Sequence, residues 1–230
     1  MTRERPAAPP GGGGPSGPHG CRGAQATLGG MILAAGDSSR MGVPKALLPL
    51  GDSGESFLAR LVGVYRLAGI ETVAVVVGPS VPAVAAAAKA LASPVVVAVN
   101  SFPARGQLSS LIVGLDALED SLPGRLDAAL VTPVDMPLVA VETVALLAEK
   151  WRSTRAPVIR PERDGRHGHP VIFDKAVFEE LRRSDLSLGA RSVVHARATS
   201  LVDVRVEDEG AFIDIDTRGD YERYVGNWPV

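Results

Sequence analysis

The residues best suited to chemistry lie near the start of the apolar part of the chain, in the stretch Leu33-Ala34-Ala35-Gly36-Asp37-Ser38-Ser39-Arg40-Met41-Gly42-Val43-Pro44-Lys45. An apolar run ends at Gly36, and small polar residues then lead to two cations, Arg40 and Lys45. Backbone N–H groups in such a loop can turn toward an anion, and small side chains allow a ligand to approach closely. The two cations would add fixed positive charge. The stretch therefore predicts a polyphosphate site.

The stretch differs from two widespread phosphate-binding patterns. It matches neither G-x-x-x-x-G-K-[ST] nor G-x-G-x-x-G, so these fingerprints are excluded. The competing interpretation is a glycine-bearing turn with two surface cations. Small residues at the turn positions, combined with both cations at this spacing, favour phosphate binding.

Three aspartates offer oxygen ligands for a divalent cation. Asp135 follows a predicted strand, and ligands of open α/β sheets bind beyond the carboxyl ends of the strands. A carboxylate there can hold Mg²⁺ that also contacts substrate phosphates, although a turn or helix-capping role before Pro137 is the alternative. Asp214 and Asp216 alternate with isoleucines, so both should point to one side of an extended segment. That side could face a metal, a cationic loop or solvent.

Two further segments carry polar side chains of interest. Asn100 and Gln107 offer amide groups that can read the edge of a base, and Gly106 would let a flat ring approach the backbone. The alternative is a plain loop, and Ser109 is expected to cap the following helix in either case. His169, within a G-H-P tripeptide, could bind a substrate phosphate, orient an acid or simply be exposed on a polar hairpin.

The elements that must position these residues alternate along the chain. Near-continuous apolar runs predict strands at residues 31–35, 72–77, 95–99 and 128–131, and helical patterns occupy residues 57–68, 81–91, 109–118 and 141–151. Later segments predict strands at residues 157–159, 170–173 and 201–206, helices at 176–183, 188–198 and 219–225, and a turn at Asp164-Gly165. The order predicts an open, three-layered, mostly parallel α/β sheet with right-handed crossovers.

Composition limits the class of protein. The chain has 230 residues, 46% of them hydrophobic, and a net charge of −2, which allows one α/β domain and gives no reason to propose nucleic acid or a membrane as partner. The lone Cys21 allows no internal disulfide, and the cytoplasm is the default location. Residues 1–26 are rich in Pro and Gly, so we expect a disordered tail, or a targeting or partner-binding tail, before a domain at 27–230.

Taken in chain order, the motifs resemble those of the molybdenum cofactor cytidylyltransferase family, whose members carry a MobA-like NTP transferase domain. The matching motifs are L-A-A-G-x-S-x-R-M-G-x-x-K, N…G-x-x-x-S, D-M-P, G-H-P and D-I-D-T-x-x-D, and they cover about residues 30–225. The resemblance implies a nucleotidyltransferase fold, similar to Rossmann and GT-A folds. It also implies that Asp135 of D-M-P holds Mg²⁺ and that Asp216 is a second metal contact.

The resemblance extends to the substrates. It implies that the triphosphate is held by Leu33, Ala34, Ala35, Gly36, Ser38, Arg40 and Lys45, and that the nucleoside is surrounded by Gly78, Asn100, Gly106 and Gln107. Arg40, Lys45 and Asp135 would be the catalytic residues, and His169 would lie near the acceptor. The Val134 that precedes D-M-P, where the family commonly has Gly, departs from the pattern without affecting these residues.

The reaction implied is attack of an acceptor phosphate on the α-phosphorus of a nucleoside triphosphate, with release of pyrophosphate. Ala35 resembles the cytidylyl branch, so the resemblance favours CTP, with molybdenum-loaded molybdopterin as acceptor and a molybdenum hydroxylase apoenzyme or its chaperone as partner. The alternatives are GTP, a sugar phosphate or another small phosphorylated acceptor, and a catalytically silent nucleotide-binding regulatory subunit. The joint presence of Arg40, Lys45, Asp135 and Asp216 argues against a silent subunit.

Overall fold

A computed structural model of the chain describes residues 1–2, 26–36, 41–92 and 95–229. Its strands are β1 (Thr27–Ala34), β2 (Val73–Val77), β3 (Val96–Val99), β4 (Leu126–Pro133), β5 (Val158–Arg163), β6 (Arg166–His167), β7 (Val171–Asp174) and β8 (Val202–Arg205). Its α-helices are α1 (Phe57–Leu67), α2 (Pro82–Lys89), α3 (Gln107–Ser121), α4 (Val141–Thr154), α5 (Phe178–Arg183), α6 (Arg191–Ala196) and α7 (Arg218–Tyr224). Within these ranges, no helix is both long and apolar enough to cross a membrane.

The strands form one mixed sheet whose first half is parallel. Its order is β3-β2-β1-β4-β7-β5-β6, and β8 adds to β5. Strands β3, β2, β1 and β4 run parallel, whereas β7 is antiparallel to both β4 and β5. The chain order reverses direction at β1, which has β2 on one side and β4 on the other. A crevice for ligands is expected beyond the carboxyl ends of β1 and β4 for this reason.

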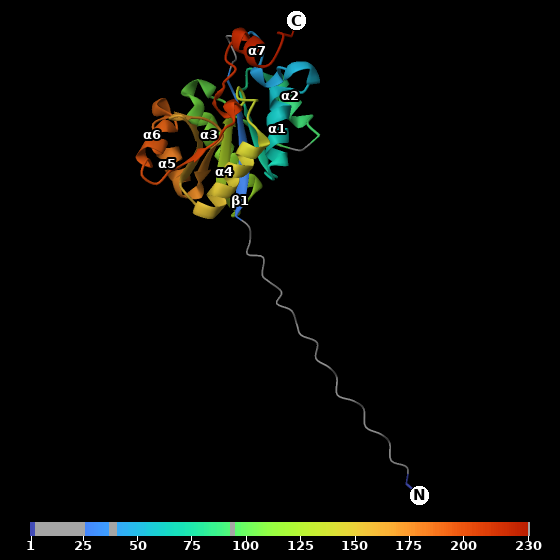
Figure 1. Cartoon of the computed structure of the whole chain (residues 1–230), viewed down its shortest axis with the longest axis vertical. Coiled ribbons are helices and arrows are strands. Elements are labelled where there is room, and N and C mark those ends of the chain that lie inside the picture. Colours follow the sequence, from blue (N-terminus) through green and yellow to red (C-terminus); the bar gives the residue numbers. More distant parts are fainter. Residues whose placement is uncertain (3–25, 37–40, 93–94, 230) are drawn as a thin grey trace.

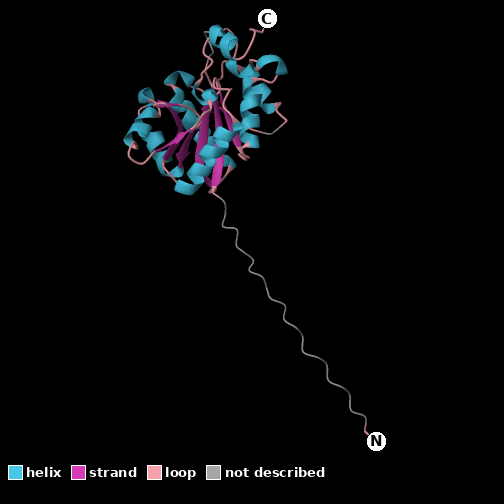
Figure 2. Ribbon diagram, in the orientation of Figure 1, coloured by secondary structure: helices cyan, strands magenta, loops and turns pink. Residues whose placement is uncertain are grey.

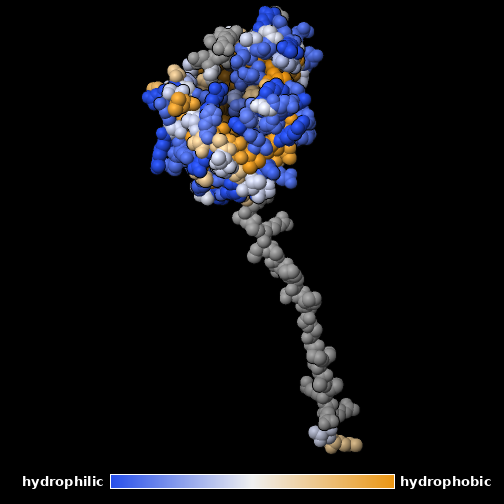
Figure 3. Space-filling model, turned by 60° about the vertical axis from the view of Figure 1, so that its left-hand side comes forward, coloured by the Kyte–Doolittle hydropathy of each residue, from blue (hydrophilic) through white to orange (hydrophobic). Residues whose placement is uncertain are grey.

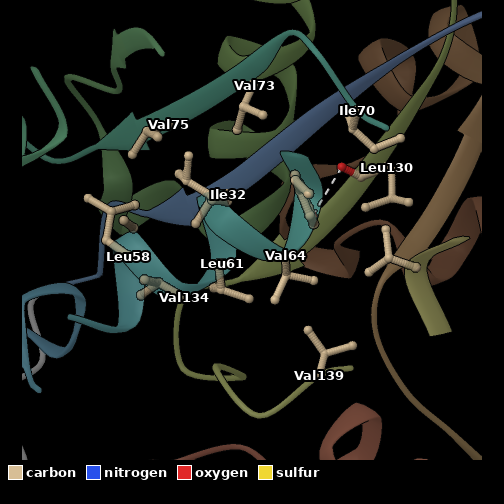
Figure 4. Packing of buried hydrophobic residues seen from close by; sticks show 14 of the residues in the cluster. Ile32, Leu58, Leu61, Val64, Ile70, Val73, Val75, Leu130, Val134 and Val139 are labelled. Atoms are coloured by element: carbon tan, nitrogen blue, oxygen red, sulfur yellow. Dashed lines mark hydrogen bonds between the residues drawn. The ribbon is translucent and has the colours of Figure 1, made fainter. Parts of the chain in front are cut away.

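Helices cover both faces of the sheet, as the predicted three-layer architecture requires (Figures 1 and 2). Successive side chains of β1 point to opposite faces, so Ile32 and Ala34 join one core cluster while Met31 and Leu33 join the other. The first cluster includes buried residues of α1, α2, α4 and α7, and the second includes those of α3, α5 and α6. Figure 4 shows the first cluster around Ile32, Leu61 and Leu130.

Close packing fixes the position of β1, from which the phosphate-binding stretch departs. A Cβ at Gly30 would overlap the ring of Tyr65 on α1, and a Cβ at Gly114 on α3 would overlap the side chain of Met31. The buried Tyr65 hydroxyl donates a hydrogen bond to Thr132 Oγ1 on β4 at 2.8 Å. Burial raises the pKa of Tyr65, and the bond to Thr132 only partly offsets this effect. Helix α1 is thus tied to both strands that end at the crevice.

The regular elements of the first half match the sequence-based predictions closely, and Pro82 begins α2 as expected. The Asp164-Gly165 turn is also confirmed: these residues have φ values of 52° and 77° and connect β5 to the antiparallel β6. The prediction that Ser109 caps the next helix is wrong. The helix begins at Gln107, directly after Gly106 with φ 94°, and the Ser109 hydroxyl instead donates to Gly106 O at 2.7 Å.

The later elements differ more from the predictions. The expected helix at residues 188–198 is only α6, Arg191–Ala196, because Gly189 has a φ of 64° and separates it from a preceding 3₁₀ turn. The segment around Asp214 and Asp216 is extended but forms no strand. The expected tail at residues 1–26 lies almost entirely outside the described residues.

Candidate active site

A cleft of about 420 Å³ lies at the carboxyl ends of β1 and β4. It brings together eight of the residues singled out in the sequence: Leu33, Ala34, Ala35, Gly36, Lys45, Gln107, Asp135 and Asp216. These residues span most of the chain, and it is the parallel arrangement of β1 and β4 that places their ends side by side. The topology therefore confirms that the Gly36 and Asp135 loops share one crevice.

Lys45 is the central charge of the cleft. It begins a 3₁₀ helix, Lys45–Leu47, and its side chain is only 12% exposed. The ammonium Nζ donates to Asp135 Oδ2 at 3.2 Å and also to Asp216 Oδ1. Two carboxylates thus converge on one cation in a partly buried setting, where charge–charge interactions are stronger than in bulk water.

The donor chemistry at this point also fits a divalent metal. Asp135 and Asp216 supply the hard oxygen ligands that Mg²⁺ prefers, and Mg²⁺ commonly takes one or two carboxylates with water and substrate phosphates completing its shell. The described residues contain no cluster of three or more His, Cys, Asp or Glu side chains suited to a metal. A metal here would accordingly depend on phosphate oxygens for further ligands.

Asp216 reaches the cleft through the local structure of its segment. The Ile215 N–H donates to Asp135 O at 2.8 Å, which holds this segment against the end of β4. A capping box then starts α7: Thr217 Oγ1 accepts from Asp220 N–H at 3.1 Å, and Asp220 Oδ2 accepts from Thr217 N–H at 2.8 Å. Asp214, two residues earlier, is exposed.

Asp135 does not cap helix α4, whose N-cap is Ala140 and has no side-chain cap hydrogen bond. Helix α4 begins at Val141, and Asp208 Oδ2 accepts from the Ala140 N–H at 2.9 Å. Asp135 instead lies in the turn that follows β4, where Met136 N–H donates to Pro133 O at 3.2 Å, and from this turn its side chain faces Lys45.

Asn100 holds the loop that follows β3. It is buried, its amide nitrogen donates to the hydroxyls of Ser109 and Ser110 at 2.9 Å each, and its Oδ1 accepts from Phe102 N–H at 2.9 Å. In this geometry its amide shapes the loop, and direct contact with a nucleoside stays a prediction. Gln107, in contrast, is exposed and lines the cleft.

Gly78 lies against the start of the phosphate-binding stretch. A Cβ at this position would come within 2.8 Å of Ala35 O. The absence of a side chain therefore lets the turn after β2 pack against the end of β1. Ser38 and Arg40 lie outside the described residues, so their roles toward the triphosphate remain predictions.

His169 is half-buried rather than an exposed hairpin residue, which corrects that alternative. Its Nδ1 is 3.4 Å from Val131 O, and its backbone N–H donates to Ala211 O at 2.9 Å. Burial lowers the pKa of His169, and this effect outweighs the opposite influence of the Val131 carbonyl and of the Asp135 and Asp214 charges. The imidazole is therefore neutral at neutral pH.

His169 lines a second cavity of about 710 Å³, which adjoins the first because Leu33 and Gln107 line both. Four basic residues of this cavity were missed in the sequence: Arg160, His167, Arg191 and His195. They come from the β5–β6 hairpin and from α6; helical spacing connects Arg191 with His195, but no spacing connects this pair with Arg160 and His167. Only the tertiary structure could identify them as one group.

Comparison with known proteins agrees with the geometry of the cleft. Residues 30–202 match the family model described as "MobA-like NTP transferase domain". The chain belongs to this family. As a MobA-like NTP transferase it is a nucleotidyltransferase, and the predicted fold class is confirmed.

Individual relatives of this MobA-like protein support the assignment. A "probable molybdenum cofactor guanylyltransferase" of Rhodopirellula baltica is 35% identical, over 67% of this chain and 71% of the relative. The crystal structure of Rv0371c from Mycobacterium tuberculosis H37Rv is similar with a TM-score of 0.71 and 31% identity, covering 87% of this chain and 97% of that chain. A structure of Rv0371c in complex with manganese is similar with a TM-score of 0.68 and 28% identity, covering 87% and 98%.

Proposed function

We propose that the protein transfers CMP from CTP to the phosphate of molybdenum-loaded molybdopterin, with release of pyrophosphate. The observation that carries this proposal is the convergence of Asp135 and Asp216 on Lys45 in the cleft at the ends of β1 and β4. The relatives named molybdenum cofactor guanylyltransferases support the class of acceptor.

The chemistry requires little more than positioning and charge neutralisation. An acceptor phosphate oxygen attacks the α-phosphorus, a new P–O bond forms, and the bond from the α-phosphorus to the bridging oxygen breaks as pyrophosphate leaves. A phosphate monoester is already an anion near neutral pH, so the nucleophile needs no general base. Lys45, together with Arg40, would hold the triphosphate and offset the charge that develops on the leaving group.

Asp135 and Asp216 are the residues that would hold a divalent metal, for which we propose Mg²⁺. The metal would supply Lewis-acid stabilisation of phosphate oxygens. The manganese complex of the related Rv0371c protein is consistent with use of a divalent ion. Asp135 also has a fixed backbone, because its carbonyl accepts from Ile215 N–H.

The choice of CTP rests on Ala35, a residue that is 5% exposed and lines the cleft. The second candidate is GTP, because the relatives at 34–35% identity are named guanylyltransferases. The two candidates share the same transfer chemistry and differ only in recognition of the base.

The test is a comparison of all four ribonucleoside triphosphates with Mg²⁺, first by thermal shift and then by transfer to molybdenum-loaded molybdopterin. A ligand that binds only the native state raises the melting temperature. We expect the largest shift and the fastest release of pyrophosphate with CTP. Preference for GTP in both measurements would show that the nucleotide substrate is GTP and not CTP. Absence of pyrophosphate release with every triphosphate would contradict the proposal that the protein catalyses nucleotidyl transfer.

A further inference from the structure

The second cavity has an unusual charge for this protein. Its lining includes two arginines and three of the four histidines in the sequence, and no aspartate or glutamate. The whole chain carries a net charge of −2, so the lack of carboxylates in this lining does not follow from the overall composition. Such a lining suits an anionic ligand.

The basic side chains in this cavity are not equivalent. Arg160 is already paired, since its Nε is 2.6 Å from Asp203 Oδ1 and its Nη2 lies 2.9 Å from His167 Nε2. Partial burial raises the pKa of Asp203, but Arg160 and His167 outweigh that effect and hold the pKa below its usual value. The positive charge of Arg160 is thus largely neutralised by its ion pair with Asp203.

Arg191 and His195 differ from Arg160 in this respect. Both are exposed on α6, and neither side chain has a hydrogen-bond or ion-pair partner among the described residues. They are four positions apart on α6, so their side chains lie on the same face of the helix. Both line the cavity.

Apolar residues form a further part of the wall, and the cavity adjoins the cleft. Leu111, Val171 and Phe173 line it, and Leu33 and Gln107 are shared with the cleft that holds Asp135. The volume of about 710 Å³ lies within the range of small-molecule sites. A ligand here could place one end in the cleft and the other end at α6.

We propose that Arg191 and His195 bind a second anionic group of the acceptor, separate from the phosphate that attacks the α-phosphorus. The inference rests on the proposed function, because it assumes that the acceptor occupies this cavity. It specifies the acceptor as a phosphomonoester with a further anionic group, the two being joined by a body that can pack against Leu111 and Phe173. Arg191 and His195 are then binding and specificity residues.

The first test uses steady-state transfer with the full-length protein. Arg191→Gln should raise the KM for the acceptor about 10-fold or more, because a charged hydrogen-bond donor to the ligand is lost, and Arg191→Gln with His195→Gln should raise it further, because a second donor is lost. The KM for the triphosphate should stay unchanged, and kcat should change little. The matched control is Arg183→Gln, an 81% exposed arginine on α5 outside both cavities. An unchanged acceptor KM in the double variant would overturn the inference.

The second test separates this inference from the proposed function. Inorganic phosphate is titrated into the protein saturated with triphosphate and Mg²⁺, and the imidazole resonances of His195 are followed by NMR. We expect phosphate-dependent shifts in the wild type that are lost in Arg191→Gln and kept in Arg183→Gln. Absence of shifts in the wild type would overturn the anion site. Shifts without any transfer to molybdopterin would support the anion site and contradict the proposed acceptor.

Discussion

The two adjoining cavities differ in both charge and origin. The first is built around an ion-paired Lys45 with Asp135 and Asp216, and its walls come from the ends of parallel strands. The second is lined by arginines and histidines without a carboxylate. It shares Leu33 and Gln107 with the first cavity, and its other walls include residues of β4, of the antiparallel strands β5, β6 and β7, and of α6. On the face of the molecule drawn in Figure 3, the described residues at the surface are mostly hydrophilic, with smaller hydrophobic areas. If the proposed function and the proposed anion site hold, reaction chemistry and acceptor recognition are carried by separate parts of one fold.

The strongest test of this division is Asp135→Asn. We expect transfer to fall roughly 100-fold or more, because the substitution keeps the shape but removes the charge that would hold a divalent cation. Turnover is measured against Mg²⁺ concentration, and the melting temperature is recorded in parallel. Asp216→Asn should show a smaller loss, since Asp216 is more exposed than Asp135. Asp214→Asn is the matched control, and damage greater than that of Asp216→Asn would reassign the second metal contact.

Lys45→Ala should affect the first cavity alone. We expect turnover and triphosphate affinity to fall about 10- to 100-fold, because a charged donor to the phosphates is lost and the two carboxylates lose their nearby cation. Calorimetric titration with the triphosphate and a turnover assay measure the two effects. Lys150→Ala, an exposed lysine on α4, is the control. Unaltered affinity in Lys45→Ala would show that the ammonium does not contact phosphate.

Gly168→Ala should damage the second cavity and leave triphosphate binding intact. A Cβ at Gly168 would overlap Ala211 O, the same oxygen that accepts from His169 N–H, so the backbone around His169 must move. We expect a loss of roughly 1–3 kcal/mol in the free energy of unfolding, measured by denaturant titration. Gly219→Ala serves as control because its nearest contact would be an ordinary 3.7 Å from Thr217 Oγ1. Equal stability of the two variants would contradict the packing argument.

The smallest expected effect is a pH dependence from His169. Its folded-state pKa lies below the ordinary value of 6.5, so the unfolded chain binds the proton more readily. The free energy of unfolding should therefore decrease as the pH falls from about 6.5 toward the folded-state pKa. His169→Gln should flatten this decrease, whereas His195→Gln, at an exposed position, should retain it. Denaturant titrations across this pH range measure both slopes, and a retained slope in His169→Gln would assign the effect to other groups.

The sequence by itself determined the parallel half of the fold and one side of the cleft. Strands that are buried on both faces must be largely apolar, so the sequence was sufficient to predict β1, β2 and β4. The edge strand β3 is only partly buried, but its four residues are also Val and Ala. The phosphate-binding stretch and Asp135 directly follow two of these strands, and parallel strands bring their carboxyl ends to one edge. Local order in the chain was therefore sufficient to predict that Gly36, Lys45 and Asp135 lie together.

The tertiary structure decided that Asp216, which the resemblance had matched to a metal contact, also pairs with Lys45, and it alone decided what forms the second cavity. Asp214 and Asp216 have the same residue type and equivalent spacing, and the bond from Ile215 N–H to Asp135 O, with the capping box of α7, places Asp216 in the cleft. Asn100 has an amide suited to a ligand, but this amide is buried and its nitrogen donates hydrogen bonds to the hydroxyls of Ser109 and Ser110. Arg160, Arg191 and His195 line the same cavity only because the antiparallel strand β7 pairs with β4 and brings the later part of the chain beside it. Contacts between segments so distant along the chain leave no periodic signal, so their chemistry becomes visible only when the sheet is assembled.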